Sequence, residues 1–179
     1  MNSFKKRKYW VLSILTVSII ILDQLTKTLV VKHFRLGETL SIITDFFNFT
    51  YIRNTGAAFG IFAHANPAFR IPFFVIVPII ALAAIAYIFR KIPDTDLKLS
   101  SALSLVIGGA VGNLIDRIQL GYVVDFLDFH WNYRYHFPAF NIADSAICIG
   151  VGILMLDLIT QKASEQKEGE QKIDASSSG

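Results

Sequence analysis

Ile71–Phe89, with the sequence IPFFVIVPIIALAAIAYIF, is a run of 19 residues without a charged side chain. A helix needs about 20 mostly apolar residues to cross the hydrocarbon core of a bilayer. Three further apolar segments have similar lengths and lie at about 9–31, 99–115 and 140–159. Because a helix satisfies its own backbone polar groups, the sequence predicts four membrane-spanning helices.

The composition of the whole chain favours the same fold class. Of its 179 residues, 53% are hydrophobic and only 17% are charged, whereas soluble domains have about 25% charged residues. The formal net charge of +3 would by itself allow a nucleic-acid partner. However, residues 5–8 form one basic run directly before an apolar segment, which is typical of a cytoplasmic membrane surface. We therefore expect membrane lipid and no nucleic acid as a partner.

The basic residues also predict the orientation of the spans. The first apolar segment resembles a signal peptide, but the polar stretch Asp23–Lys27 stands where a cleavage site needs small residues, so we interpret it as a retained span. The short link 90–98 is basic as well, and the positive-inside rule assigns both basic stretches to the cytoplasm. Both termini are then cytoplasmic, and the external segments are 32–70 and about 117–138.

The external segments and the tail differ in character. Thr39–Ile52 is rich in β-branched and aromatic residues, which predicts one or two strands in a small sheet at the membrane interface or against the helix ends. The polar tail alternates charges and predicts disorder. We expect an all-α membrane protein with four transmembrane helices and a small external β-rich part. Its membrane domain covers 1–161, with the insertion at about 32–70, and a disordered cytoplasmic tail covers 162–179.

Ionisable side chains inside the spans are the first candidates for function, because each costs about 2.5–3.5 kcal/mol at a helix centre. Asp23 and Lys27 are four residues apart and share a helix face, which predicts an ion pair that is structural or that orients a site. Asn113 and Asp116, followed by Arg117, form either a polar helix end or the support of a site.

Asp125 and Asp144 are predicted to lie at the same membrane face. On one continuous helix Asp125 would point away from Asp116, but Gly121 allows the helix to end between them. Asp144 lies about five residues into the fourth span, where a lone carboxylate is costly, and Asn141 shares its face. Two carboxyls in one site can share a proton, which suits peptide hydrolysis. A proton or ion path and a non-catalytic scaffold with structurally paired acids remain open alternatives.

Other catalytic schemes have weaker support. The four histidines form no H-E-x-x-H arrangement. Asp128, His130 and His136 are conceivable metal ligands, but their aromatic neighbours fit an interface belt better, and we expect Asp128 nearer water. Cys148 lies inside the fourth span and is predicted to be a buried, inert thiol. We therefore expect no metal.

Five stretches of this sequence together resemble the lipoprotein signal peptidases, the signal peptidase II family of bacterial inner-membrane aspartyl proteases. Each stretch is weak alone, whereas all five in this order in a four-span chain are highly specific. They are Asp23–Lys27 (DQLTK), Asn54–Gly60 (NTGAAFG), Gly108–Arg117 (GGAVGNLIDR), Val123–Phe126 (VVDF) and Phe140–Asp144 (FNIAD).

The resemblance implies that a catalytic dyad falls on Asp125 and Asp144. It implies a diacylglyceryl prolipoprotein as substrate, cut on the N-terminal side of the lipid-modified cysteine, with no metal or cofactor. It further implies inhibition by globomycin-type cyclic peptides, a location in the bacterial inner membrane with the site near the outer face, and an external β-rich cradle. The positions that would hold substrate or shape the site are Asp23, Lys27, Asn54, Gly56, Asn113, Asp116, Arg117, Asn141 and Ala143.

Overall fold

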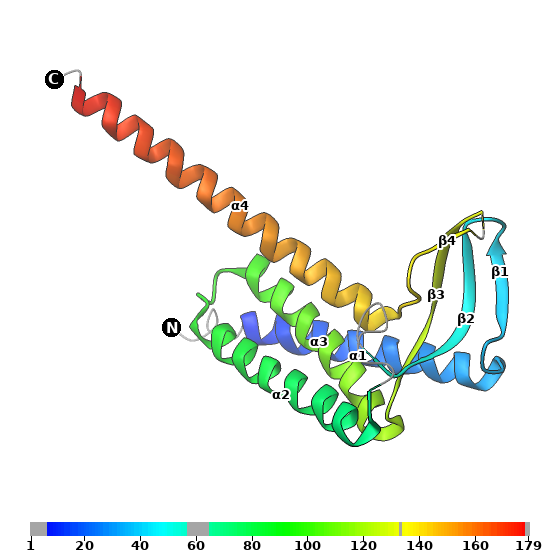
Figure 1. Cartoon of the computed structure of the whole chain (residues 1–179). Helices are drawn as coiled ribbons and strands as arrows, with labels where there is room; N and C mark the ends of the chain where they lie inside the picture. The colour runs from blue at the N-terminus through cyan, green and yellow to red at the C-terminus, as the bar shows by residue number, and fades with distance from the viewer. Residues whose placement is uncertain (1–6, 57–64, 133, 178–179) are drawn as a thin grey trace.

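The computed structural model in Figure 1 describes residues 7–56, 65–132 and 134–177. Within these ranges, four helices are long and apolar enough to cross a membrane, which confirms the prediction of four spans. Their outward faces expose large apolar side chains such as Ile80 and Leu156, at 63% and 62%. The helices are α1 (Arg7–His33), α2 (Pro67–Lys91), α3 (Leu97–Leu120) and α4 (Ile142–Ser177), of which Ile142–Lys162 forms the apolar part.

Helix α3 is the centre of the bundle and packs against α1, α2 and α4 (Figure 1). Glycines on α3 allow this close packing. A Cβ at Gly109 would collide with the carbonyl oxygen of Ala143 on α4. A Cβ at Gly112 would come within 2.7 Å of Asp23 Oδ2 on α1. These glycines therefore bring the polar residues of α1 and α4 to the same end of α3.

Gly121 ends α3, as the sequence predicts. Its φ of 77° lies in the left-handed region, and its N–H donates to Arg117 O at 3.1 Å. Glycine adopts this conformation without the steric cost of a Cβ. The chain therefore leaves the helix axis and turns back into strand β3 (Val123–Trp131) over the end of the bundle.

A four-stranded antiparallel sheet covers this end of the bundle (Figure 1). Strands β1 (Thr39–Ile43) and β2 (Phe47–Asn54) confirm the expected strands in 39–52. Strand β3 and the short β4 (Tyr135–His136) are additional, and β2 is paired with β3. An apolar cluster joins the sheet to the end of α1 and contains Val30, Tyr51, Val124 and Phe126.

The opposite end of the bundle is held by charged side chains. Lys8 is 4% exposed, donates to Ile92 O at 2.6 Å and lies 3.3 Å from Asp94 in the α2–α3 link. Lys98 and Asp157 form a 2.9 Å ion pair between α3 and α4. Lys8, although part of the N-terminal basic run, is therefore buried in the protein.

Helix α4 continues past the apolar part to Ser177. The sequence predicts a disordered tail from residue 162, so the helical backbone differs from that prediction. The tail is rich in Glu, Gln, Lys and Ala, which have high helix propensity. Extending an existing helix also avoids the cost of nucleation, which explains why a polar segment without an apolar face continues the helix. The domain boundary at residue 161 stays a prediction.

Candidate active site

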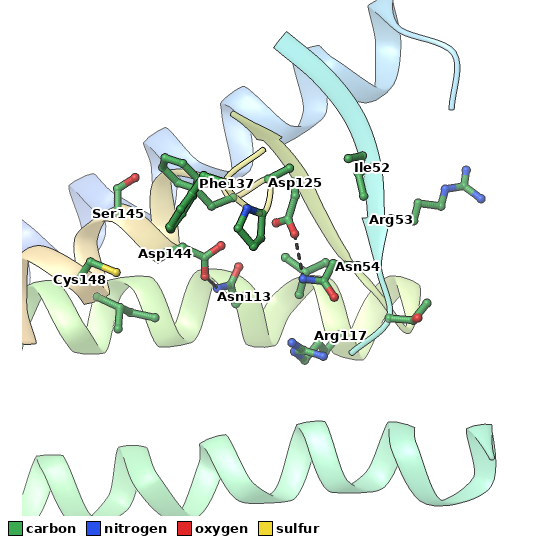
Figure 2. Close-up of a pocket in the computed structure, with 16 residues that line it drawn as sticks. Ile52, Arg53, Asn54, Asn113, Arg117, Asp125, Phe137, Asp144, Ser145 and Cys148 are labelled. Carbon is green, nitrogen blue, oxygen red and sulfur yellow. Dashed lines mark hydrogen bonds between the residues drawn. The ribbon is translucent and has the colours of Figure 1, made fainter. Parts of the chain in front are cut away.

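A cavity of about 880 Å³ opens at the sheet end of the bundle, between β2, β3, α3 and the start of α4 (Figure 2). Its wall is mainly apolar, with Phe137 and Ile147 among the contributing side chains. Its polar and charged lining residues are Arg53, Asn54, Thr55, Asn113, Arg117, Asp125, Asp144 and Ser145.

Asp125 reaches this wall from β3. Its carboxylate is buried, with the residue only 1% exposed. Oδ2 accepts a hydrogen bond from Asn54 Nδ2 at 3.0 Å, drawn in Figure 2, and Oδ1 accepts from Asn141 Nδ2 at 2.7 Å. Burial, with a further contribution from the charge of nearby Asp144, raises the pKa of Asp125 to about 7. This carboxyl group can therefore hold or release a proton near neutral pH.

Asp144 reaches the same cavity from the first turn of α4 (Figure 2). Its Oδ1 accepts from Asn113 Nδ2 at 2.7 Å. Its backbone N–H donates to Asn141 Oδ1 at 2.9 Å, while its Oδ2 accepts from Asn141 N at 3.3 Å. This reciprocal arrangement caps the helix N-terminus, where a carboxylate is also favoured by the helix dipole.

Asn141 connects the two aspartates. It is fully buried, its side-chain oxygen caps α4 at Asp144, and its side-chain amide donates to Asp125. The same amide lies 3.2 Å from Asn113 Oδ1. The two carboxylates, 19 residues apart in the sequence, therefore line one cavity and share a hydrogen-bonding neighbour.

A buried ion cluster lies behind this wall. Lys27 Nζ is 2.8 Å from Asp23 Oδ2 and 3.0 Å from Asp116 Oδ2, and all three residues are at most 3% exposed. Lys27 Nζ also donates to Asn113 Oδ1 at 3.0 Å. The ion pair expected between Asp23 and Lys27 is thus present. Asp116 joins it, and buried charges of this kind require such partners.

Gln24 belongs to the same cluster, although we predicted no role for it from the sequence. Its Nε2 donates to Asp116 Oδ1 at 2.9 Å and to Gly112 O at 3.2 Å. The signal was its position between two charged residues in an apolar span, where an amide is costly unless it is hydrogen-bonded.

The segment that follows β2 is anchored beside Asp125. Asn54 Oδ1 accepts from Gly56 N at 3.0 Å, and Arg117 Nη2 donates to Gly56 O at 3.0 Å. The Arg117 guanidinium also lies 4.4 Å from the centre of the Phe74 ring on α2. Asn54, Gly56 and Arg117 are therefore brought together as one edge of the site. The rest of the NTGAAFG stretch, 57–60, lies outside the described residues.

Two expectations about individual residues are wrong. Asp128 is only 8% exposed, because the β2–β3 register puts Asn48 opposite it and Asn48 Nδ2 donates to its Oδ2 at 3.0 Å. Cys148 is exposed, because it lies on the side of α4 that lines the cavity. Over the described part of the chain, no group of three or more His, Cys, Asp or Glu side chains is arranged to hold a metal ion.

Comparison with known proteins shows to which family this chain is related. The family model described as signal peptidase (SPase) II matches residues 15–160. The lipoprotein signal peptidase of Syntrophotalea carbinolica is 48% identical over 152 residues, covering 85% of this chain and 92% of the relative. That of Syntrophus aciditrophicus is 49% identical over 161 residues, covering 89% and 99%.

The solved structures agree with the sequence matches. A structure described as a bacterial membrane enzyme, determined by the in meso method, superposes with a TM-score of 0.77 at 38% identity and covers 86% of this chain and 90% of its own. A family match over most of the chain, relatives at this level of identity and a shared fold lead to one conclusion: the chain belongs to the signal peptidase II family.

Proposed function

We propose that this multi-pass membrane protein is an intramembrane aspartyl endopeptidase with Asp125 and Asp144 as its catalytic dyad. It removes the signal peptide from diacylglyceryl-modified bacterial prolipoproteins and cuts N-terminal to the lipidated cysteine. Family membership and the named activity of the relatives support the processing of prolipoproteins. The observation that carries the aspartyl mechanism is the pair of carboxylates on one cavity wall, joined through Asn141.

The chemistry requires the dyad to hold a single proton. The ionised carboxylate removes a proton from a water molecule, whose oxygen attacks the scissile carbonyl carbon, while the protonated carboxyl gives its proton to the carbonyl oxygen. In the resulting tetrahedral diol the C–N bond then breaks, the nitrogen takes up a proton from the protonated carboxyl of the dyad, and the ionised carboxylate takes the proton of one diol hydroxyl, which restores the singly protonated pair. The products are a signal peptide with a new carboxyl end and a lipidated cysteine with a free amine. A pKa of about 7 for Asp125 suits a pair that is singly protonated near neutral pH.

The cavity wall suits a substrate that is both peptide and lipid. Its apolar part, which includes Phe137 and Ile147, can accept acyl chains. Asn54 and the anchored Gly56 segment can hydrogen-bond an extended peptide, with Arg117 fixing that segment. Globomycin-type cyclic peptides are expected to compete for the same cavity.

The orientation is inferred from the distribution of charge. The basic residues Arg90, Lys91 and Lys98 flank the α2–α3 link at one end of the bundle, and the sheet lies at the other end (Figure 1). The positive-inside rule then favours cytoplasmic termini and a site near the outer face, and membership of the family supports a location in the bacterial inner membrane. The scissile bond beside a lipid-anchored cysteine would lie at that same depth.

The test uses purified protein in micelles with a diacylglyceryl prolipoprotein, and mass spectrometry of both products. We expect release of the signal peptide and a product that begins with the lipidated cysteine. The same precursor without its lipid serves as the substrate control.

Variants then test the dyad. Asp125→Asn and Asp144→Asn should each abolish turnover in folded protein, whereas Asp157→Asn, an acid of α4 at the other end of the bundle, should retain it. Full activity of either dyad variant would overturn the assignment, and cleavage at another bond would overturn the proposed cut position.

A further inference from the structure

Each dyad aspartate is preceded by a residue whose main-chain N–H donates a hydrogen bond to a buried acid. Asp116 Oδ2 accepts a hydrogen bond from Val124 N at 3.0 Å, and Val124 directly precedes the dyad aspartate of β3. Asp23 Oδ1 accepts from Ala143 N at 3.0 Å, and Ala143 directly precedes the dyad aspartate of α4. The same kind of contact is therefore made twice, by acids that come from α3 and α1.

Lys27 joins these two acids into one unit. Its Nζ lies within 3.0 Å of both carboxylates, and Gln24 Nε2 donates to Asp116 at 2.9 Å and lies 3.2 Å from Asp23. We call Asp23, Lys27 and Asp116 the backbone clamp. Lys27 therefore contacts both arms of the clamp.

The clamp also fixes the amide that contacts Asp144. An ammonium group can only donate, so the contact with Lys27 Nζ requires Asn113 to present its oxygen, at 3.0 Å. The amide nitrogen of Asn113 then faces Asp144 Oδ1, to which it donates at 2.7 Å. Lys27 is thus two hydrogen bonds away from the α4 carboxylate.

We infer that the backbone clamp sets the spacing and orientation of the catalytic carboxylates, which makes Asp23, Lys27 and Asp116 positioning residues of the reaction. This inference rests on the proposed dyad. A contribution to stability does not by itself explain why these buried charges are present, because well-packed apolar residues often stabilise a core as well as a buried ion pair does. The contacts are instead directed at the two amides that precede the reacting groups.

Asp116 offers a graded test by steady-state kinetics on the lipidated substrate. Asp116→Ala removes the acceptor for Val124 N, and we expect kcat to fall about 100-fold, as for displacements of about 1 Å at reacting groups, with KM nearly unchanged. Asp116→Asn keeps one oxygen for Val124 N and Lys27. Gln24 can rotate its amide to accept from the new NH₂ group, at the cost of its own contacts with Gly112 O and Asp23 Oδ2. This variant should therefore recover at least about 10-fold in kcat over Asp116→Ala.

Hydrogen exchange at Val124 provides a readout independent of activity. We expect faster exchange of this amide in Asp116→Ala and protection close to wild type in Asp116→Asn. Asp94→Ala, which weakens the Lys8 pair at the other end of the bundle, is the control for general destabilisation, and it should lower Tm without changing kcat.

The outcomes separate the clamp from the dyad. Equal kcat in Asp116→Ala and wild type, or equal loss in the Ala and Asn variants with Val124 still protected, would overturn the clamp while leaving the dyad intact. Full activity in Asp125→Asn would instead overturn the proposed function, whatever the clamp variants show.

Discussion

Asn141→Ala should separate the two roles of the residue that connects the aspartates. The change removes the N-cap of α4, worth about 1 kcal/mol, and leaves a buried oxygen of Asp125 without its 2.7 Å partner, which costs about 1–3 kcal/mol. We therefore expect a loss of about 2–4 kcal/mol in the free energy of unfolding, measured by denaturation in mixed micelles.

The same variant should change the pH dependence of catalysis. Because the Asn141 amide stabilises ionised Asp125, its removal raises the pKa of Asp125 further above about 7. The alkaline limb of kcat/KM should then move up by about 1 pH unit, the equivalent of one hydrogen bond to a charged group.

Asn141→Ser is the matched control. The serine hydroxyl can cap α4, but the side chain is too short to reach Asp125. This variant should therefore regain about 1 kcal/mol of stability over Asn141→Ala, while the alkaline limb of kcat/KM stays shifted. An alkaline limb that stays at the wild-type pH in both variants would refute the role of Asn141 at Asp125.

Three further outcomes follow from the geometry. Burial raises the pKa of Asp125 to about 7 from its ordinary value of 3.8, so the folded state loses stability as the pH rises between these values, and Asp125→Asn should lose this dependence in thermal unfolding at pH 5 and pH 8. Gly112→Ala places a Cβ 2.7 Å from Asp23 Oδ2 and should lower kcat by displacing this carboxylate, but by less than Asp23→Ala, which removes the acceptor of Ala143 N altogether. Arg117→Met removes the donor to Gly56 O and should raise KM more than it lowers kcat, in the same cleavage assay.

Much of the helical fold could be predicted from the sequence, because spanning helices leave an unbroken apolar signal. Ile71–Phe89 and the break at Gly121 are both determined by local chemistry. Strand β3 was missed because Asp125 and Asp128 interrupt its apolar pattern. Its stability comes from pairing with β2, which is a contact between distant segments.

Part of the candidate site could be predicted from the sequence for a related reason. An ionisable residue in an apolar span needs a partner, so the sequence alone singles out Asp23, Lys27 and Asp144. The partners themselves could not be assigned, because the contact of Lys27 with Asp116 and the role of Gln24 depend on how α1 and α3 pack.

The most direct test of the shared-proton mechanism is a structure of the protein with a non-cleavable substrate analogue that carries a hydroxyl in place of the scissile carbonyl. The proposed mechanism predicts that this hydroxyl lies between the carboxylates of Asp125 and Asp144, about 2.6–3.2 Å from each or one water away. A hydroxyl that contacts only one of them, with the other carboxylate turned out of the cavity, would contradict the dyad.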